Sequence, residues 1–223
     1  MFLRLLFFIT PFMCFAQESK TVYAFIGELL EYKKVDYIEY YNLKKKVISK
    51  VTLEVGDTST YYETIKNPPI LMDEMYLAKY KIIKWLHNNV EKDTIEFVSF
   101  DHYGIPAAFN SKTPILYLGY NEKKGEYFQY KYQFDDAFIY KNKWVGIYNF
   151  RSNFISEYLI DDKLIKVRIS YNLPEEFDIN NSEIREKYFP SKFYKIKNNR
   201  KTTLIKAFDV NDLVEARVKS INK

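Results

Sequence analysis

Hydrophobic and polar side chains alternate along most of the chain after residue 20, which is the pattern of half-buried β-strands. Between Tyr76 and Trp85, for example, apolar residues occupy every second position, and Lys79 and Lys81 fall between them. Segments of this kind are predicted to form strands over residues 22–30, 36–41, 47–53, 76–85, 93–100, 115–120, 126–134, 138–140, 143–148 and 163–171.

Short polar connections separate many of these segments. Residues 122–125 (Glu-Lys-Lys-Gly) and the Lys141-Asn142 pair have the length and composition of hairpin loops. Pro68 and Pro69 exclude their own stretch from a paired strand, because proline has no backbone N–H to donate. The pattern therefore indicates an antiparallel meander.

Two helices are predicted near the C-terminus. Ser182 can cap a short helix over residues 183–188, and Pro190 follows its end. Asp209 can cap a second helix, whose apolar residues fall on one stripe: Val210, Leu213, Val214, Val218 and Ile221.

These elements predict a mainly β protein, an antiparallel β-barrel with a C-terminal extension that contains one or two short helices. The chain has 223 residues, enough for one large β domain. The meander ends near residue 148 without a change in composition. We therefore expect a β-barrel domain over residues 17–148 and a β/α extension over residues 149–223, packed on the same core.

Residues 1–16 have the pattern of a cleavable signal peptide. Arg4 supplies the positive charge, and the apolar run after it contains no charged side chain. Cys14 and Ala16 place small residues at the −3 and −1 positions, so we expect cleavage after Ala16. A membrane anchor needs roughly 20 apolar residues, and Pro11 interrupts this shorter run. The anchor, a lipoprotein acylated at Cys14 and a buried core segment are the alternatives to export.

The signal peptide places the mature protein in the periplasm or outside the cell, with no transmembrane segment. Cys14 is the only cysteine in the chain, so the mature protein is expected to contain no disulfide and no thiolate metal ligand. Its core material is aromatic, because Phe, Trp and Tyr make up 18% of the residues.

The charge of the chain argues against a nucleic-acid partner. Its 34 basic and 29 acidic residues give a net charge of only +5, and the basic residues are spread along the sequence. Local runs occur at residues 44–46 and 195–201. We interpret both as solvated turns or as edge strands that charge protects from pairing.

Four of the hydrophobic segments share a further arrangement: residues 24–29, 78–84, 93–97 and 115–118. Over about residues 22–140, this arrangement resembles the netrin-like, tissue-inhibitor-of-metalloprotease type of OB-fold barrel. The resemblance implies an OB-like barrel in a secreted protein. The inhibitors in that family chelate the protease zinc through an N-terminal cysteine, which the expected mature chain lacks. Residues 143–146 also resemble segments of exported Bacteroidetes proteins.

Asp101, His102 and Tyr103 are the first candidate site. They place a carboxylate, an imidazole and a phenol beside the flexible Gly104, and an acid–base pair needs such groups within hydrogen-bond reach. Neighbouring residues on a strand point to opposite faces. The alternative is therefore a polar turn after the strand over residues 93–100.

Trp85 and Trp144 are the second candidate, as a stacking surface for sugars or peptides or, alternatively, as core packing. The acidic pairs 135–136, 161–162 and 175–176 could serve hydrolysis or calcium binding, or form hydrated turns.

No cofactor or metal is expected. His87 and His102 lie 15 positions apart without metal-ligand spacing, and His87 fits a surface turn. A G-x-S-x-G motif and a glycine-rich phosphate loop are both missing from the sequence.

We therefore hypothesise an exported, non-enzymatic binding or envelope-accessory protein. Its candidate ligand surface comprises Asp101, His102, Tyr103, Trp85 and Trp144, and its partner would be a protein or a glycan of the envelope. Two alternatives stay open. One is a periplasmic inhibitor or immunity-type protein that binds a protein partner. The other is a hydrolase that works through carboxylates with His102.

Overall fold

The structure is a computed structural model and describes residues 20–42, 72–148, 158–159, 163–172, 181–196 and 201–223. The predicted signal peptide with Cys14 lies outside these residues, as does the strand predicted over residues 47–53. The elements in chain order are β1 (Tyr23–Val35), β2 (Glu74–His87), β3 (Thr94–Asp101), the 3-10 helix η1 (Ala107–Asn110), β4 (Pro114–Asn121), β5 (Glu126–Tyr140), β6 (Lys143–Tyr148), β7 (Ile165–Asn172), α2 (Ser182–Tyr188), β8 (Tyr194–Ile196), β9 (Lys201–Asp209) and α3 (Val210–Ile221).

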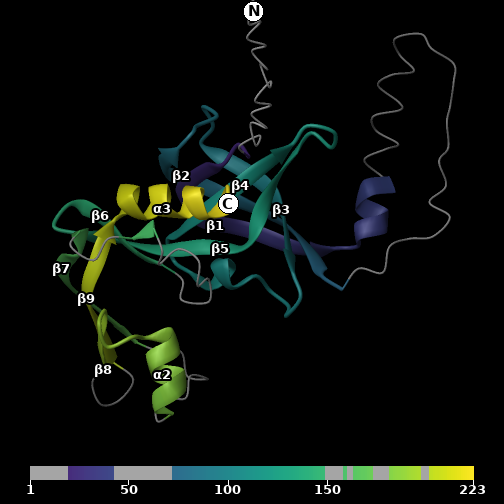
Figure 1. The fold of residues 1–223 in the computed structure, drawn as a ribbon. Helices are drawn as coiled ribbons and strands as arrows, with labels where there is room; N and C mark the ends of the chain where they lie inside the picture. The colour runs from purple at the N-terminus through teal and green to yellow at the C-terminus, as the bar shows by residue number, and fades with distance from the viewer. Residues whose placement is uncertain (1–19, 43–71, 149–157, 160–162, 173–180, 197–200) are drawn as a thin grey trace, which may run out of the picture.

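Strands β1 to β5 close into a ring (Figure 1). β1 pairs with β2 and β4, β2 pairs with β3, and β4 pairs with β5, all antiparallel. The ring closes where β3 pairs in parallel with β5, at Phe97 opposite Tyr127 and Val98 opposite Phe128. The five strands therefore form a barrel-like closed sheet. The expected mainly β, barrel-like fold with short C-terminal helices is therefore confirmed.

The first part of β1, from Ala24 to Gly27, and most of β4 are buried on both faces. Phe25 and Leu116 belong to the core inside the barrel, together with Tyr80. Ile26 and Ile115, their neighbours in sequence, belong to a second core on the other side of the same strands. Double-sided burial explains why residues 24–26 of β1 and 115–118 of β4 are continuous hydrophobic runs, whereas the start of β2 alternates.

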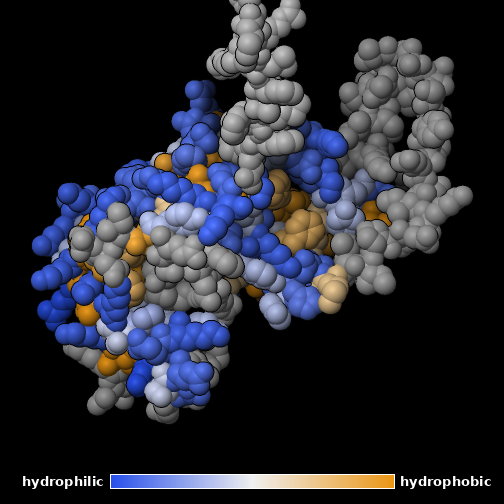
Figure 2. Space-filling view, viewed as in Figure 1, coloured by the Kyte–Doolittle hydropathy of each residue, from blue (hydrophilic) through white to orange (hydrophobic). Residues whose placement is uncertain are grey.

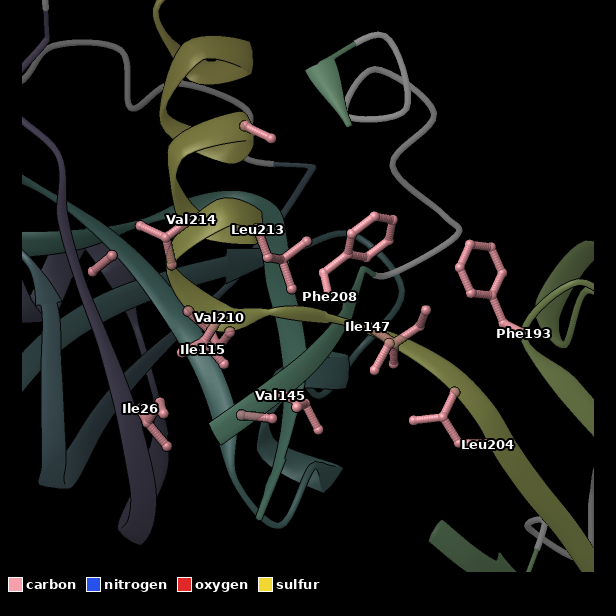
Figure 3. Close-up of a cluster of buried hydrophobic side chains, with 14 of the residues drawn as sticks. Ile26, Ile115, Val145, Ile147, Phe193, Leu204, Phe208, Val210, Leu213 and Val214 are labelled. Carbon is pink, nitrogen blue, oxygen red and sulfur yellow. The ribbon is translucent and has the colours of Figure 1, made fainter. Parts of the chain in front are cut away.

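The C-terminal extension supplies the other half of this second core (Figure 3). β6 pairs with β5 and β9, and β9 pairs with β7 and β8. Leu213 and Val214 point from α3 toward the strands that carry Ile115 and Ile147. Asp209 accepts a hydrogen bond from the N–H of Asn211 at 2.9 Å, which confirms the predicted helix cap. The extension therefore packs on the outer wall of the barrel.

The strand predicted over residues 36–41 is wrong, because residues 37–42 form a helix. The Asp36 side chain accepts a hydrogen bond from the N–H of Glu39 at 2.8 Å, as an N-cap does. The rings of Tyr37 and Tyr41, one helical turn apart, have their centres 4.6 Å apart. A capping aspartate and packing between tyrosines outweigh the strand-like composition.

β5 joins the two strands predicted over residues 126–134 and 138–140. The alternation is interrupted at Tyr132, whose φ of 62° is unusual for a bulky residue. Alternation over residues 126–134 places Gln129 with Lys131 on the polar face of the strand, but Gln129 is only 5% exposed and accepts a hydrogen bond from the Ser99 hydroxyl at 2.9 Å. The predicted face of this part of the strand is therefore wrong.

The sequence predicts the β5–β6 turn and the start of α2 more closely. The Lys141-Asn142 connection is a hairpin turn with positive φ at both residues, 50° and 61°, as a type I′ turn requires. The predicted cap of α2 shifts by one residue, because the Asn181 side chain, and not that of Ser182, accepts from the N–H of Glu183 at 3.1 Å.

Candidate functional site

A groove with a volume of about 550 Å³ lies over β2 and β3. Leu77 and Lys79 face it from β2, because the residues that alternate with them, Tyr76, Ala78 and Tyr80, point into the barrel core. β3, the helix over residues 37–42, the β2–β3 turn and the β4–β5 hairpin supply the rest of the lining. The lining residues are Tyr40, Leu77, Lys79, Lys92, Thr94, Ile95, Glu96, Phe97, Val98, Tyr120, Gly125, Glu126 and Tyr127.

The helix over residues 37–42 is fastened to the β4–β5 hairpin beside this groove. Glu126 accepts hydrogen bonds from the hydroxyls of Tyr41, at 2.6 Å, and Tyr40, at 3.3 Å. The Lys124 ammonium group lies 3.8 Å from the centre of the Tyr41 ring, within the range of a cation–π contact. These contacts fix one wall of the groove.

Charges along the groove are paired. The Lys79 ammonium group lies 3.4 Å from a Glu96 carboxylate oxygen. Lys79 and Lys92 balance Glu96 and Glu126 in formal charge. Burial, followed by the charge of Glu126, raises the pKa of Tyr40 to about 12, so its hydroxyl is a neutral donor near pH 7. The groove offers donors, acceptors and balanced charge instead of a field of one sign.

Tyrosine rings add apolar faces to the same site. The ring centres of Tyr120 and Tyr127 are 4.8 Å apart, and Tyr120 is 43% exposed. Such rings combine an apolar face with a polar hydroxyl, which suits ligands that are themselves part apolar and part polar.

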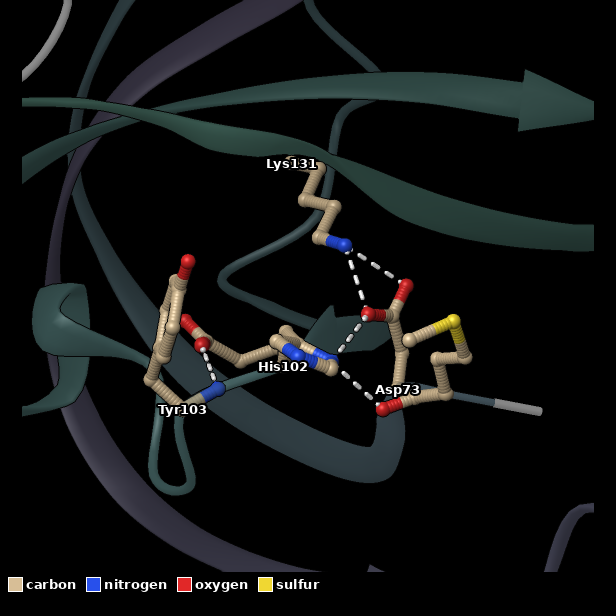
Figure 4. Close-up of polar contacts among 6 residues, drawn as sticks. Asp73, His102, Tyr103 and Lys131 are labelled. Atoms are coloured by element: carbon tan, nitrogen blue, oxygen red, sulfur yellow. Dashed lines mark hydrogen bonds and ion pairs between the residues drawn. The ribbon is translucent and has the colours of Figure 1, made fainter.

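A second polar cluster joins the start of β2, the end of β3 and β5 (Figure 4). Lys131 donates to both carboxylate oxygens of Asp73, at 2.6 and 2.7 Å. His102 Nδ1 lies 2.7 Å from the carbonyl oxygen of Met72 and 3.7 Å from Asp73 Oδ1. Because a carbonyl oxygen can only accept, Nδ1 carries the proton in this contact.

Two solvent-exposed tyrosines lie beside this cluster. Tyr103 is 86% exposed and Tyr132 is 41% exposed, with ring centres 6.4 Å apart. Asp101, which is buried, accepts a hydrogen bond from the backbone N–H of Tyr103 at 2.8 Å. The turn after β3 thus holds Tyr103 in place.

The candidate residues from the sequence fall into three places. Asp101, at the end of β3, is followed by His102 and Tyr103 in the turn after it, and the carboxylate that pairs with the His102 ring is that of Asp73. Trp85 packs against Phe25 at the barrel core, with ring centres 5.3 Å apart. Trp144 packs against the second core. The two tryptophans therefore belong to different clusters.

Of the three acidic pairs named in the sequence, the structure describes the one at residues 135–136, and both of its side chains are held by other residues. Asp135 is fully buried and pairs with Arg217. Burial raises the pKa of its neighbour Asp136, against a hydrogen bond from Ser111 that lowers it. The pairs at residues 161–162 and 175–176 lie outside the described residues.

Within the described ranges, no group of three or more His, Cys, Asp or Glu side chains is placed to hold a metal ion. No helix in the same part of the chain has the length and hydrophobicity needed to cross a bilayer. Comparisons with family models, curated proteins and solved structures gave no match to this chain.

Proposed function

We propose that this is an exported, non-enzymatic binding protein that holds an uncharged polar ligand of the oligosaccharide class in the groove over β2 and β3. The position of the groove carries the proposal. In OB-type barrels, the face of strands 2 and 3 and the loops beside it bind oligonucleotides and oligosaccharides. The groove here lies over the second and third strands of the ring, beside the wall that the helix over residues 37–42 and the β4–β5 hairpin form together.

The lining favours a sugar over a nucleic acid. A polyanion needs unbalanced positive charge, whereas Lys79 is paired with Glu96 in this groove. Hydroxyl-rich ligands need both donors and acceptors, which Lys92, Thr94 and Glu126 can provide. Tyr120 and Tyr127 add rings on which the apolar face of a sugar can stack.

Titration calorimetry of the purified protein with neutral cello-, xylo-, malto- and chito-oligosaccharides tests this proposal. We expect at least one of these oligosaccharide series to bind. Tyr120→Ala should raise the Kd for that series by about ten-fold or more, which corresponds to a loss of about 1.4 kcal/mol of binding free energy. Ile139→Ala is the matched control, because Ile139 is 63% exposed but near the other end of β5. Failure of every neutral series to bind would contradict the proposal, as would salt-sensitive binding to heparin alone.

Product analysis of the same mixtures separates binding from catalysis. Glu96 and Glu126 both line the groove, and hydrolysis of glycosides uses two carboxyl groups. We expect the bound oligosaccharide to be recovered intact. If the oligosaccharide is hydrolysed and Glu96→Gln or Glu126→Gln abolishes this turnover, the protein is a hydrolase and not a binding protein.

A further inference from the structure

A separate surface lies on the small sheet that β7, β8 and β9 form in the C-terminal extension. β9 runs through the middle of this sheet, because β7 and β8 both pair with its residues 202–204 and therefore flank it. Figure 2 shows hydrophilic side chains along the left edge of the molecule, where Figure 1 places β7 and β9. We call this surface the basic face, and it comprises five cationic residues of the three strands: Lys166, Arg168, Lys195, Lys201 and Lys206.

On β7 the basic side chains point away from the second core. Val167 belongs to that core, and Ile165 and Ile169 pack against it. Successive residues of a strand point to opposite sides. Lys166 and Arg168 lie between these apolar residues, so they point outward, and both are exposed.

The other two strands place their cations on the same outer side. Lys195 of β8 lies directly opposite Thr203 of β9, and Lys201 is two positions from Thr203, so the three residues share one side of the sheet. The Thr203 hydroxyl lies 3.0 Å from the hydroxyl of Ser170, which is exposed and follows Arg168 by two positions on β7. The outer side of all three strands is therefore basic.

Two lysines of the basic face are held directly opposite each other. Lys166 of β7 is the cross-strand partner of Lys206 of β9, and like charges in this arrangement repel. None of the five cations forms an ion pair with a residue that the structure describes, whereas Lys163 lies 2.6 Å from Asp212. An anionic group bound over the two lysines would relieve their repulsion and accept charge-assisted hydrogen bonds from both.

Protection of a sheet edge does not account for this charge. Charged side chains commonly keep edge strands from pairing, and β7 is an edge within the described part of the chain, but β9 is paired on both sides. Residues 163–174 and 187–208 contain no Asp or Glu. Asp209, the last residue of β9, is engaged as the cap of α3. The basic face is thus a field of one sign, in contrast to the groove.

The distribution of exposed apolar side chains narrows the class of partner. Among the described residues, the large hydrophobic side chains that are exposed run from Leu30 to Ile139, and none lies in the extension. Faces that bind lipid surfaces or proteins usually add apolar anchors to their charge, and single-stranded nucleic acid stacks on exposed rings. The basic face instead intersperses cations with the hydroxyls of Ser170 and Thr203. An extended polymer that carries both acid groups and hydroxyls matches these donors and acceptors.

We propose that the basic face binds an acidic polysaccharide. The carboxylates or sulfates of the polymer contact the five cations across β7, β9 and β8, and one acid group lies over the pair of Lys166 and Lys206. No residue of the basic face lines the groove. The proposal therefore does not rest on the binding of neutral oligosaccharides there.

Titration calorimetry at low ionic strength with polygalacturonate, a carboxylated polymer, and with heparin, a sulfated one, tests this proposal. We expect at least one of the two to bind, and binding to weaken as salt is added. The double variant Lys166→Gln with Lys206→Gln should raise the Kd by about ten-fold or more. Lys81→Gln with Lys84→Gln is the matched control, because it removes the same charge from exposed positions of β2, and it should leave the Kd nearly unchanged.

Two further measurements make the outcome decisive. Thermal unfolding of the Lys166 and Lys206 double variant should occur at or above the temperature of the parent protein, because a repulsion is removed. Vesicles of equimolar phosphatidylglycerol and phosphatidylcholine, and duplex DNA, should bind more weakly than the polysaccharide. The proposal is overturned if neither polysaccharide binds, if the two double variants weaken binding equally, or if vesicles or DNA bind as tightly as the polysaccharide.

Discussion

Arg217 on α3 and Asp135 on β5 form an ion pair in which both side chains are fully buried. Arg217 Nε donates to Asp135 Oδ2 at 3.2 Å, and the Tyr117 hydroxyl donates to the same oxygen at 2.7 Å. Arg217 Nη1 also donates to the Gln133 side chain at 2.9 Å. The network ties the last helix to the barrel wall, where an unpaired charge would have no access to water.

Arg217→Met should therefore destabilise the protein by about 3–5 kcal/mol, because it leaves the Asp135 carboxylate buried without its cation. Denaturation by urea measures the free energy of unfolding. Lys219→Met is the control, since Lys219 pairs with Glu215 on the exposed side of the same helix, and it should have no measurable effect. Equal effects of the two substitutions would show that the pair of Arg217 and Asp135 is hydrated.

Buried tyrosines should make the protein sensitive to alkali. Burial, followed by the hydrogen bond to Glu74, raises the pKa of Tyr76 to about 12, and burial also raises the pKa of Tyr80. Unfolded tyrosine titrates near pH ~10. The fold thus favours the neutral form, so this stabilisation is complete below that pH and is lost as pH rises through the folded pKa.

The free energy of unfolding should accordingly fall as pH rises above about 10, and tyrosinate absorbance should show groups that ionise late. Tyr80→Phe should make the decline shallower. Tyr103→Phe, which alters an exposed ring, should leave the decline as it is. A decline that neither substitution changes would have to come from other groups.

Gly119 is required by the close approach of β4 to an aromatic ring. A Cβ atom at this position would lie 2.3 Å from Cζ of Phe128. We expect Gly119→Ala to destabilise the protein by about 1–3 kcal/mol through overpacking. Phe128→Leu in the same chain should recover part of the loss, and additive effects in this double-mutant cycle would contradict the contact.

The helix over residues 37–42 should depend on its cap. Asp36→Ala removes the acceptor for the N–H of Glu39, at a cost of about 0.5–2 kcal/mol to the helix. Amide hydrogen exchange over residues 37–42 should become faster, while exchange in β2 should not change. Asp36→Asn is the matched control and should keep exchange slow, because asparagine also caps helices.

β2 and α3 could be predicted from the sequence because each buries one face and exposes the other. Tyr76, Ala78 and Tyr80 enter the core while Lys81 remains exposed, so period-two alternation is visible. β9 was not predicted. It lies between β7 and β8, and its buried residues Ala207 and Phe208 are adjacent where strict alternation would separate them.

The candidate sites could also be predicted only in part, because the sequence shows neighbours along the chain and not contacts between distant strands. Asp101, His102 and Tyr103 were found because they are neighbours in sequence. Asp73 joins His102 through the pairing of β2 with β3, and Lys131 joins them from β5, and no local pattern contains either contact. The groove was missed for the same reason, because Tyr40 and Glu126 are 86 positions apart.

The double-sided burial of β1 and β4 also sets an order of events during synthesis. The outer face of β1, with Ala24 and Ile26, is covered by a core to which Leu213 and Val214 of α3 contribute. A ribosome produces β1 long before α3, so this apolar face lacks the part of its cover that α3 supplies until residues 210–221 have been made. Chaperones and proteases would therefore meet a nascent or truncated chain without α3 as a form with part of its barrel wall exposed.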